Sequence, residues 1–192
     1  MGVTVNISDQ VRPALASLSA LVPSESLHKR ISANMANLVK RHLIARNQRG
    51  NEQGFPRTNF FGHAAESVNH RATASTAEVR VSKLGFGQRY FGGRIEPVKA
   101  KALTIPVHPA AYAHRAREFD LDYVPQKAGS RVLGLLVRRH AGRAAGEVFY
   151  ILVGAVTQKP DPTVLPTDAQ FDTTAAAVIE RLLRSIAQRG AI

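Results

Sequence analysis

The sequence contains no cysteine and no tryptophan, and aromatic residues make up only 6% of it. The absence of cysteine excludes a disulfide framework, a thiolate zinc site and a cysteine nucleophile. With so few aromatics, Val, Ile, Leu and Ala must build the core, and the apolar fraction of 44% suffices for one. At 192 residues the chain fits a single domain of ordinary size.

Long apolar runs are also missing. Nowhere do eighteen apolar residues follow one another, and the segment from Met1 to Asn6 shows no basic region followed by an apolar stretch. We therefore expect no membrane span, no export signal and no membrane partner, and we expect the chain to be made in a cytoplasm.

Acidic residues are scarce. Asp and Glu number 14 against 26 Lys and Arg, which gives a formal charge of +12. The excess is uneven, since residues 1–50 carry seven basic and two acidic residues, whereas residues 151–192 carry four of each. Such a charge favours contact with nucleic acid or with an acidic protein surface. A solvated basic surface that only keeps the protein soluble explains the charge equally well, so both interpretations stay open.

Two helices are predicted in the first fifty residues. Apolar residues recur at helical spacing from Ser8 to Leu21, with Ser8 as the N-cap. After Pro23 a longer pattern begins at Ser24 and ends near Arg46. One stripe of this second helix carries Leu27, Ile31, Met35, Leu38 and His42. The basic residues lie off that stripe: Lys29, Arg30, Lys40, Arg41, Arg46 and Arg49.

The middle of the chain is rich in strand patterns. Ala77, Val79 and Val81 alternate with polar residues between positions 72 and 83, which is the period of a half-buried strand. Further strands are predicted at 88–91, 102–107, 121–124, 132–138 and 148–155. The basic stretch from Arg138 to Gly146 joins the last two strands as a hairpin tip that projects into solvent or onto a partner.

Three prolines between positions 158 and 166 end the sheet, and a closing helix begins at Asp168. Its apolar stripe comprises Phe171, Ala175, Val178, Ile179, Leu182, Leu183 and Ile186. Together the patterns predict an α+β fold with a twisted, mainly antiparallel sheet of about four to six strands, flanked by N-terminal helices and a C-terminal helix. We assign residues 1–192 to a single domain, with a helical part at 1–50, the sheet at 72–156 and the C-terminal helix at 167–189.

The sequence shows no arrangement of residues typical of an enzyme. The seven histidines include no pair at HxxxH spacing, and Gly85-Phe86-Gly87 is better explained as a turn than as the start of a GxGxxG motif. We therefore predict a protein that is not an enzyme and has no catalytic residues, no metal site and no cofactor. A weaker alternative is a metal-dependent nuclease that uses Glu118, Asp120 and Asp122, the closest acidic group in the sequence.

The most informative segment is 88–108, QRYFGGRIEPVKAKALTIPVH. Gly92-Gly93 permits positive φ angles or a close backbone approach, and Pro97 favours a turn between basic residues. The stretch from Leu103 to Pro106 has the composition of a short strand that a proline ends. The segment is therefore expected to form a strand, a glycine-hinged excursion and a return strand.

This arrangement resembles the tail-completion and virion-morphogenesis proteins of tailed phages. In that family an aromatic or aliphatic residue and Gly-Gly, followed by a proline with basic neighbours, precede an L-x-I-P strand. The matching positions here are Phe91, Gly92, Gly93, Ile95, Pro97, Lys99, Leu103, Ile105 and Pro106. A weaker likeness covers most of the chain, from the basic second helix and residues 60–68 to the strand at 149–156 and the C-terminal helix.

The resemblance implies a structural virion protein that assembles as a ring, usually a hexamer, at the neck or at the head-proximal end of the tail. Its partners are then copies of itself and the neighbouring neck, connector and tail-tube proteins, and it is assembled in the host cytoplasm. The family has no catalytic residues. The acidic loop at 118–122 and the basic hairpin at 138–143 depart from the more compact relatives and leave the exact neighbour open.

Basic residues in loops are the expected contacts to DNA or to a partner. They are Arg94, Lys99, Lys101, Arg138, Arg139 and Arg143. A ring through which DNA passes gains from a weakly attractive lining, so we expect weak, salt-sensitive contact that ignores sequence. The alternative function is sequence-tolerant nucleic-acid binding, based on the charge and the basic second helix. Apart from Tyr90-Phe91, that alternative lacks the interleaved aromatic residues that stack on bases.

Overall fold

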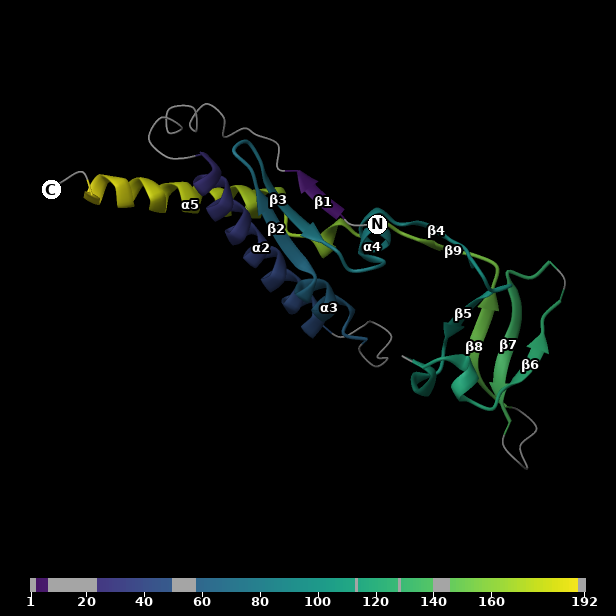
Figure 1. Cartoon of the computed structure of the whole chain (residues 1–192). Helices are drawn as coiled ribbons and strands as arrows, with labels where there is room; N and C mark the ends of the chain where they lie inside the picture. The colour runs from purple at the N-terminus through teal and green to yellow at the C-terminus, as the bar shows by residue number, and fades with distance from the viewer. Residues whose placement is uncertain are drawn as a thin grey trace. The chain divides into compact units, whose positions relative to one another are not determined.

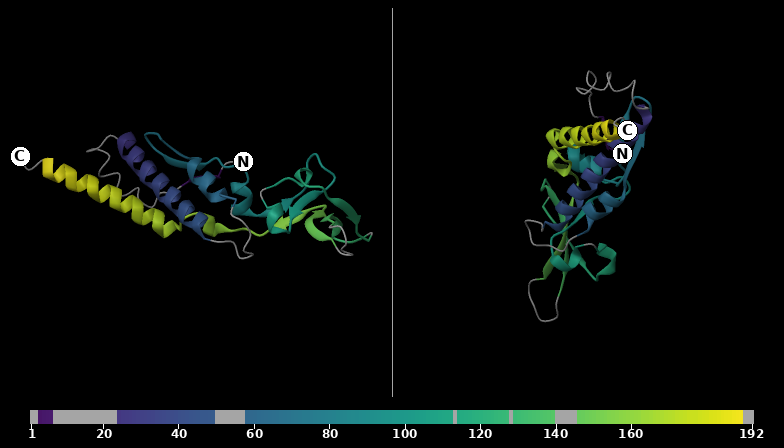
Figure 2. Two further views of the ribbon diagram at one scale, coloured as in Figure 1. Left: turned by 90° about the horizontal axis from the view of Figure 1, so that it is seen from below. Right: turned by 90° about the vertical axis from the view of Figure 1, so that its left-hand side faces the viewer.

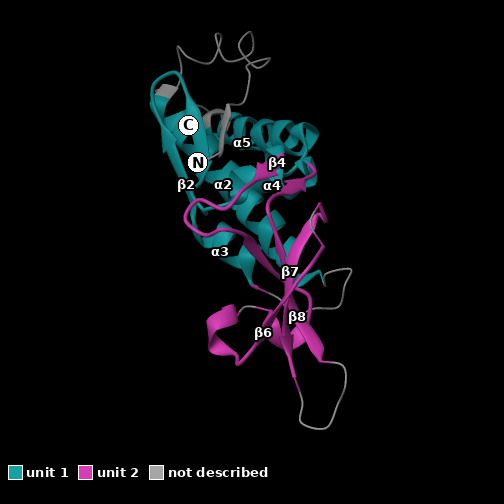
Figure 3. Cartoon of the chain, turned by 90° about the vertical axis from the view of Figure 1, so that its right-hand side faces the viewer, with its two compact units in different colours: residues 1–49, 59–91, 160–192 teal, residues 50–58, 92–159 magenta. Residues whose placement is uncertain are grey.

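The computed structural model describes residues 3–6, 24–49, 58–112, 114–127, 129–139 and 146–189 (Figure 1). Contacts along the chain divide it into two compact units, which Figure 3 shows in different colours. Unit 1 comprises residues 1–49, 59–91 and 160–192, and unit 2 comprises residues 50–58 and 92–159. We expected one domain across residues 1–192, whereas the contacts gather in two units. The helix predicted from Ser8 to Leu21 lies outside the described residues.

Unit 1 is built around the long helix α2, Ser24–Gln48. Its apolar stripe is inward-facing as predicted, because Leu27, Ile31 and Met35 are buried. Helix α3, Phe60–Glu66, and helix α5, Asp168–Arg189, both pack against it. The views in Figure 2 show α2 and α5 lying side by side. The sequence therefore predicted the central helix of this unit and the face that it buries.

The closing helix α5 also begins where the sequence predicted. Phe171, Ala175 and Val178 are buried in the core of unit 1, in agreement with the predicted stripe. Leu183, further along the same stripe, is exposed. The side chain of Ile186 lies outside the described part of the helix. The apolar stripe of α5 is thus used for packing from Phe171 to Leu182.

A polar clamp holds the chain between unit 2 and α5 against the end of α2. Arg46 pairs with Asp161 and donates hydrogen bonds to the carbonyl oxygen and the hydroxyl of Thr163, at 3.1 and 2.8 Å. His42 also contacts the Thr163 carbonyl, at 2.9 Å. Because Thr163 belongs to the 3-10 helix η3, Pro162–Val164, these bonds seat Val164 in the core.

The sheet of unit 1 has three strands in the order β1-β3-β2, all antiparallel. They are β1, Val3–Asn6, β2, Val68–Ala72, and β3, Ala77–Val81. The predicted alternation in β3 is confirmed, since Val79 and Val81 are buried. Strand β2 was not predicted, because only Val68 among its five residues is buried and the strand shows no period of two.

The strand predicted at 88–91 is wrong, because these residues belong to the short helix α4, Phe86–Phe91. Gly85 precedes the helix with a φ of +82°, a turn conformation that glycine adopts without strain. Phe86 is buried and Tyr90, four residues later, packs against the same core, which is helical spacing. Aromatic residues with high strand propensity had suggested a strand, but burial of one helix face decided the local structure.

Unit 2 contains an antiparallel four-stranded sheet in the order β5-β8-β7-β6. The strands are β5, Leu103–Pro106, β6, Asp122–Pro125, β7, Val132–Arg138, and β8, Glu147–Val153. All four agree with predicted strands to within about two residues. The hairpin between β7 and β8 was also predicted, although residues 140–145 at its tip lie outside the described part.

A separate two-stranded ribbon pairs β4, Gly93–Ile95, with β9, Val156–Gln158. Helices and antiparallel sheets together confirm the predicted α+β class, although the strands are divided among three sheets. None of the described helices has an apolar run long enough to cross a membrane.

Candidate assembly surface

The four-stranded sheet of unit 2 has an aromatic face. Residues directly opposite one another in paired strands point to the same side of a sheet. The register aligns Pro106, Tyr150, Leu136 and Tyr123 in one such row across all four strands. Two 3-10 helices, η1 at Pro109–Ala111 and η2 at Ala116–Glu118, contribute Ala111 and Ala116 to the buried cluster on this face. This side of the sheet is therefore covered by the unit itself around Tyr150 and Leu136, whereas Tyr123 on the edge strand is 57% exposed.

Phe149 is the centre of a stack on the aromatic face. Its ring is 1% exposed, and His108 stacks on it with ring centroids 4.4 Å apart and an interplanar angle of 12°. The guanidinium of Arg138 lies 4.4 Å from the centroid of the same ring. Because β8 lies between β5 and β7, His108 and Arg138 approach Phe149 from its two sides. Phe119 completes the cluster, 5.2 Å from the Phe149 ring and beneath Arg138.

Hydrogen bonds fasten the η1–η2 loop over the stack. The hydroxyl of Tyr150 donates to the carbonyl oxygens of Ala111 and His114, each at 3.2 Å. Burial raises the pKa of Tyr150, so the hydroxyl keeps its proton. His114 lies 2.9 Å from Glu118, and this hydrogen bond lowers the pKa of the Glu118 carboxyl. The aromatic face is thus a packed and hydrogen-bonded structural layer.

The opposite face of the same sheet is aliphatic. Its central row is Ile105, Ile151, Leu135 and Val124, one residue from each strand. A second row consists of Leu103, Val153 and Val132. Asp122 ends the third row beside Val137 and Val148. The nine apolar residues of these rows are called the aliphatic face below.

The aliphatic face belongs to neither buried cluster of the described residues. Both 3-10 helices belong to the aromatic cluster, and Val137 and Val153 are buried without belonging to either buried cluster of the chain. The other residues of the face are half-buried beside one another in the sheet. A sheet that is apolar on both sides needs a layer on each side to keep water away. Unit 2 supplies such a layer on the aromatic side.

Three of the six predicted basic contacts interact with groups of the chain itself. Arg94 donates to Glu96 at 2.7 Å, and Arg139 lies 2.9 Å from Asp122. Arg138 is half-buried over the Phe149 ring rather than extended from a loop. Lys99 and Lys101 are exposed between β4 and β5. Arg143 lies outside the described residues. The five described residues among the six therefore do not form one basic patch.

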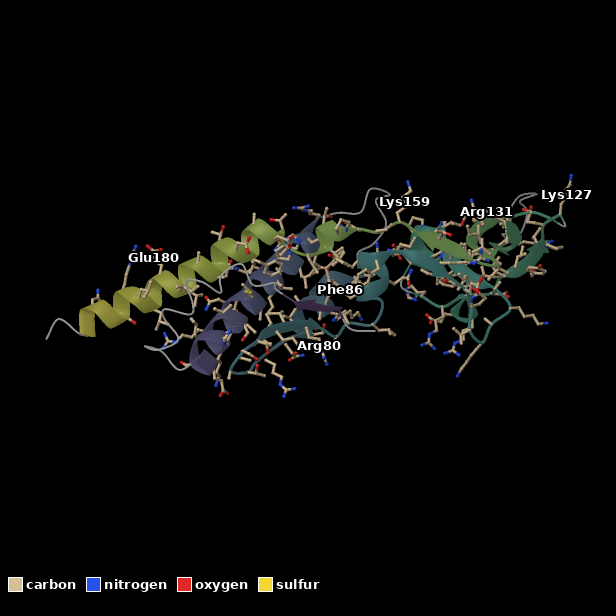
Figure 4. All side chains as sticks on the ribbon, turned by 90° about the horizontal axis from the view of Figure 1, so that it is seen from above. Arg80, Phe86, Lys127, Arg131, Lys159 and Glu180 are labelled. Carbon is tan, nitrogen blue, oxygen red and sulfur yellow. The ribbon has the colours of Figure 1, made fainter. Side chains whose placement is uncertain are left out.

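Other exposed basic side chains lie at the turn between β6 and β7. Lys127 and Arg131 both point into solvent there, as Figure 4 shows, and sequence reasoning did not single them out. Their signal in the sequence is weak, because each is a single basic residue with no charged neighbour, two positions from Gly129. On α2 the predicted basic residues Lys29, Arg30 and Arg41 are exposed.

The predicted motif spans the passage of the chain from unit 1 to unit 2, since Phe91 ends one segment and Gly92 begins the next. Gly92 and Gly93 have φ angles of +68° and +114°, which explains the glycine pair. Pro97 is half-buried beyond β4. Leu103, Ile105 and Pro106 form β5, as predicted, and pair with Val153, Ile151 and Tyr150 of β8. The excursion and the return strand are confirmed, whereas the strand expected before the glycines is helix α4.

Several large apolar side chains of the described residues are strongly exposed. Phe91, the aromatic residue of the motif, is 66% exposed, and Leu84 on the other side of α4 is 83% exposed. Val98, between β4 and β5, is 96% exposed. Strongly exposed large apolar side chains are more typical of protein–protein contacts than of nucleic-acid contacts.

The three acidic residues of the nuclease alternative do not form a site. Glu118 ends η2 and accepts a hydrogen bond from the backbone N–H of Arg115 at 3.2 Å, whereas Asp122 opens β6 and pairs with Arg139. Alternation along a strand would align the three side chains, but strand β6 begins only at Asp122. Asp120 is exposed between them. In the part of the chain that the structure describes, no three His, Cys, Asp or Glu side chains are placed to hold a metal ion.

Comparisons with family models, with curated proteins and with solved structures find nothing that matches this chain. What the protein does must therefore be inferred from its own residues.

Proposed function

We propose that this protein is a structural component of a tailed-phage virion and forms a ring at the neck or at the head-proximal end of the tail. The ring acts in tail completion, tail termination or head–tail joining, and it is assembled in the host cytoplasm. It is composed of copies of this chain, usually six in the proteins that the motif resembles, and it contacts neck, connector and tail-tube proteins. The protein is not an enzyme.

One observation carries the proposal: the surface offers apolar side chains, while three of the six predicted basic residues interact with groups of the chain itself. Phe91, Leu84 and Val98 are exposed. In contrast, Arg94 and Arg139 are ion-paired and Arg138 lies over Phe149. A phosphate backbone is bound by free cations, whereas apolar side chains gain free energy only against another protein surface. The balance favours assembly with proteins over binding to DNA.

The alternative, a sequence-tolerant nucleic-acid-binding protein, is supported by α2. Lys29, Arg30 and Arg41 are exposed on this helix. Lys99 and Lys101 add two exposed charges in unit 2. These residues are consistent with the weak, salt-sensitive contact to packaged DNA that accompanies the ring, or with binding to nucleic acid as the main activity.

Light scattering of the purified chain, with and without duplex DNA at low and high salt, separates the two functions. The assembly function predicts a discrete oligomer, or a monomer that joins a ring only with virion partners, and a mass that DNA leaves unchanged at moderate salt. A monomer or dimer that moves stoichiometrically onto DNA would instead establish the nucleic-acid-binding function. Replacing Lys29, Arg30 and Arg41 by Gln should then reduce the salt dependence of binding, and replacing the exposed Gln48 by Asn serves as the matched control.

A further inference from the structure

Tyr123, on the edge strand β6, combines high exposure with a fixed position. It is 57% exposed, although its row belongs to the aromatic face. A Cβ atom at Gly134, in the neighbouring strand β7, would lie 2.2 Å from Cε2 and 2.9 Å from Cζ of the Tyr123 ring. The phenol hydroxyl donates a hydrogen bond to the carbonyl oxygen of Leu133 at 3.3 Å. The glycine therefore leaves room for a ring that is held against β7 and still open to solvent.

The ring extends toward the turn that joins β6 to β7. Leu136 lies directly opposite Tyr123, whereas Gly134 is two residues nearer to the turn. Because the ring reaches over Gly134, it runs along the hairpin in the direction of residues 126–131. The exposed part of Tyr123 is thus close to the end of the hairpin rather than to the middle of the sheet.

Two exposed cations, Lys127 and Arg131, stand at this turn (Figure 4). Ser130 donates its backbone N–H to the carbonyl oxygen of Lys127 at 3.1 Å, so the backbone folds back here, and Arg131 follows directly. The turn therefore holds both cations at the same end of the hairpin. Within the described part of the chain, neither side chain is ion-paired.

The carboxylate that precedes the ring in sequence faces away from it. Asp122 is the neighbour of Tyr123 in β6, and successive residues of a strand point to opposite faces of a sheet. The Asp122 carboxylate lies 2.9 Å from the guanidinium of Arg139. It therefore neither covers the ring nor neutralises the two cations at the turn.

An exposed ring beside two cations has the chemistry that binds unpaired nucleotides. Every nucleobase has a π face that stacks on an aromatic side chain, and Lys and Arg attract the phosphates of the strand. The bases of a duplex are already stacked on one another, so the ring gains most from a single strand. Protein interfaces, in contrast, are depleted in lysine. The composition of the hairpin thus favours single-stranded nucleic acid over a protein partner.

We infer that the β6–β7 hairpin is a binding site for single-stranded nucleic acid, in which Tyr123 stacks on a base while Lys127 and Arg131 bind phosphates beside it. Binding at this site tolerates any sequence, because stacking requires only a base. The inference goes beyond the proposed function and does not depend on it. It also places a stacking residue outside the motif at 88–108.

Fluorescence anisotropy of a short, labelled oligothymidylate, compared with a duplex of the same length, tests the stacking at low salt. Tyr123→Leu should weaken binding of the oligothymidylate by about tenfold or more and leave binding of the duplex unchanged. Tyr123→Phe keeps the ring and should bind the oligothymidylate as the wild type does. Circular dichroism establishes that each variant is folded.

A charge-neutral pair, Lys127→Gln with Arg131→Gln, tests the cations. Each phosphate contact that is lost from a single strand lowers the slope of log K against log salt by about 0.7, so the pair should lower it by about 1.4. The matched control is Arg117→Gln with Lys159→Gln, which removes the same charge from two other exposed positions of unit 2. The control should keep a slope close to that of the wild type.

Tyrosine fluorescence gives an independent measurement, because the chain has four tyrosines and no tryptophan. A base stacked on Tyr123 quenches the emission of that ring. Addition of the oligothymidylate should therefore quench the wild-type chain more than Tyr123→Phe, although both bind it. This comparison and the charge variants decide the question even if Tyr123→Leu does not fold.

Other outcomes overturn the inference. A wild-type chain that ignores the oligothymidylate at low salt has no such site. An affinity that folded Tyr123→Leu leaves unchanged, or equal quenching in the wild type and Tyr123→Phe, removes the stacking role. Equal slopes in the two charge variants show that only net charge matters. A loss of oligomeric mass in Tyr123→Leu without a change in nucleic-acid binding assigns the hairpin to a protein partner, whereas the wild-type mass tests the proposed function separately.

Discussion

Replacing Tyr150 by Phe removes one hydroxyl from the aromatic layer of unit 2 and leaves its ring in place. That hydroxyl shares its proton between the carbonyl oxygens of Ala111 and His114, each at 3.2 Å. Tyr150 is buried, so water replaces the lost donor poorly. Leaving a buried acceptor without its donor costs about 1–2 kcal/mol, and we expect the Tyr150→Phe variant to lose that much of the free energy of unfolding at neutral pH.

The same substitution predicts a dependence on pH. Burial, and secondly the negative charge of Glu118, raise the pKa of Tyr150 above its usual value. A raised pKa in the folded state means that the contribution to stability is fully present below the pKa of the unfolded chain, near 10, and is lost as pH rises through the higher folded value. The variant carries no phenol at this position, so the difference between the two proteins should shrink in alkali.

Urea denaturation followed by the near-ultraviolet circular dichroism of tyrosine measures this difference. Three of the four tyrosines, Tyr112, Tyr123 and Tyr150, lie in unit 2, so the signal reports mainly on that unit. Titration of the other groups is common to both proteins and cancels in the comparison. Equal stability at neutral pH would refute the role assigned to the hydroxyl, and a difference that widens with pH would refute the sign of the pKa shift.

Three further substitutions test other parts of the structure. Gly93→Ala should lower the free energy of unfolding by at least about 1–2 kcal/mol, because Gly93 has a φ of +114°. Its midpoint of thermal unfolding should lie below that of the control Ala100→Gly, a change at an exposed bend. Arg46→Met keeps much of the packing but removes the ion pair with Asp161 and both hydrogen bonds to Thr163. The free energy of unfolding of unit 1 should therefore fall by about 1–3 kcal/mol. An unchanged free energy of unfolding in urea would contradict the role assigned to Arg46. Glu118→Gln should flatten the loss of stability in acid, since the hydrogen bond from His114 lowers the pKa of the Glu118 carboxyl. The stabilisation by this carboxylate is present above the usual carboxyl pKa and is lost as pH falls through the lowered pKa. A pH dependence of stability identical to that of the wild type would rule this out.

The helices and most strands could be predicted because their residues carry a clear period. In α2 the apolar residues from Leu27 to Leu43 fall on one helical face, and in β3 Val79 and Val81 alternate with polar neighbours. Strand β2 lacks such a period, since it exposes three of its five residues. Helix α4 was mistaken for a strand because propensity outweighed the spacing of Phe86 and Tyr90 in a segment of only six residues.

The basic residues could be identified from the sequence, but their partners could not. Arg139 is seventeen residues from Asp122, and Arg138 is eleven residues from Phe149, so only the pairing of strands brings them together. The aromatic cluster was missed for the same reason. His108, Phe119 and Phe149 are far apart in the sequence and meet only when β5 and β8 pair and the η1–η2 loop folds over them.

By itself the sequence determined the class of fold, the basic charge and the glycine-hinged motif, because these follow from local periods, from composition and from the conformational freedom of glycine. Only the tertiary structure decided which face of the unit 2 sheet is covered. Both faces carry apolar residues, and the period of two does not show which of them receives the η1–η2 layer. Burial of Phe149 and Tyr150 under that layer depends on contacts between distant segments, and it leaves the row from Ile105 to Val124 as the aliphatic face.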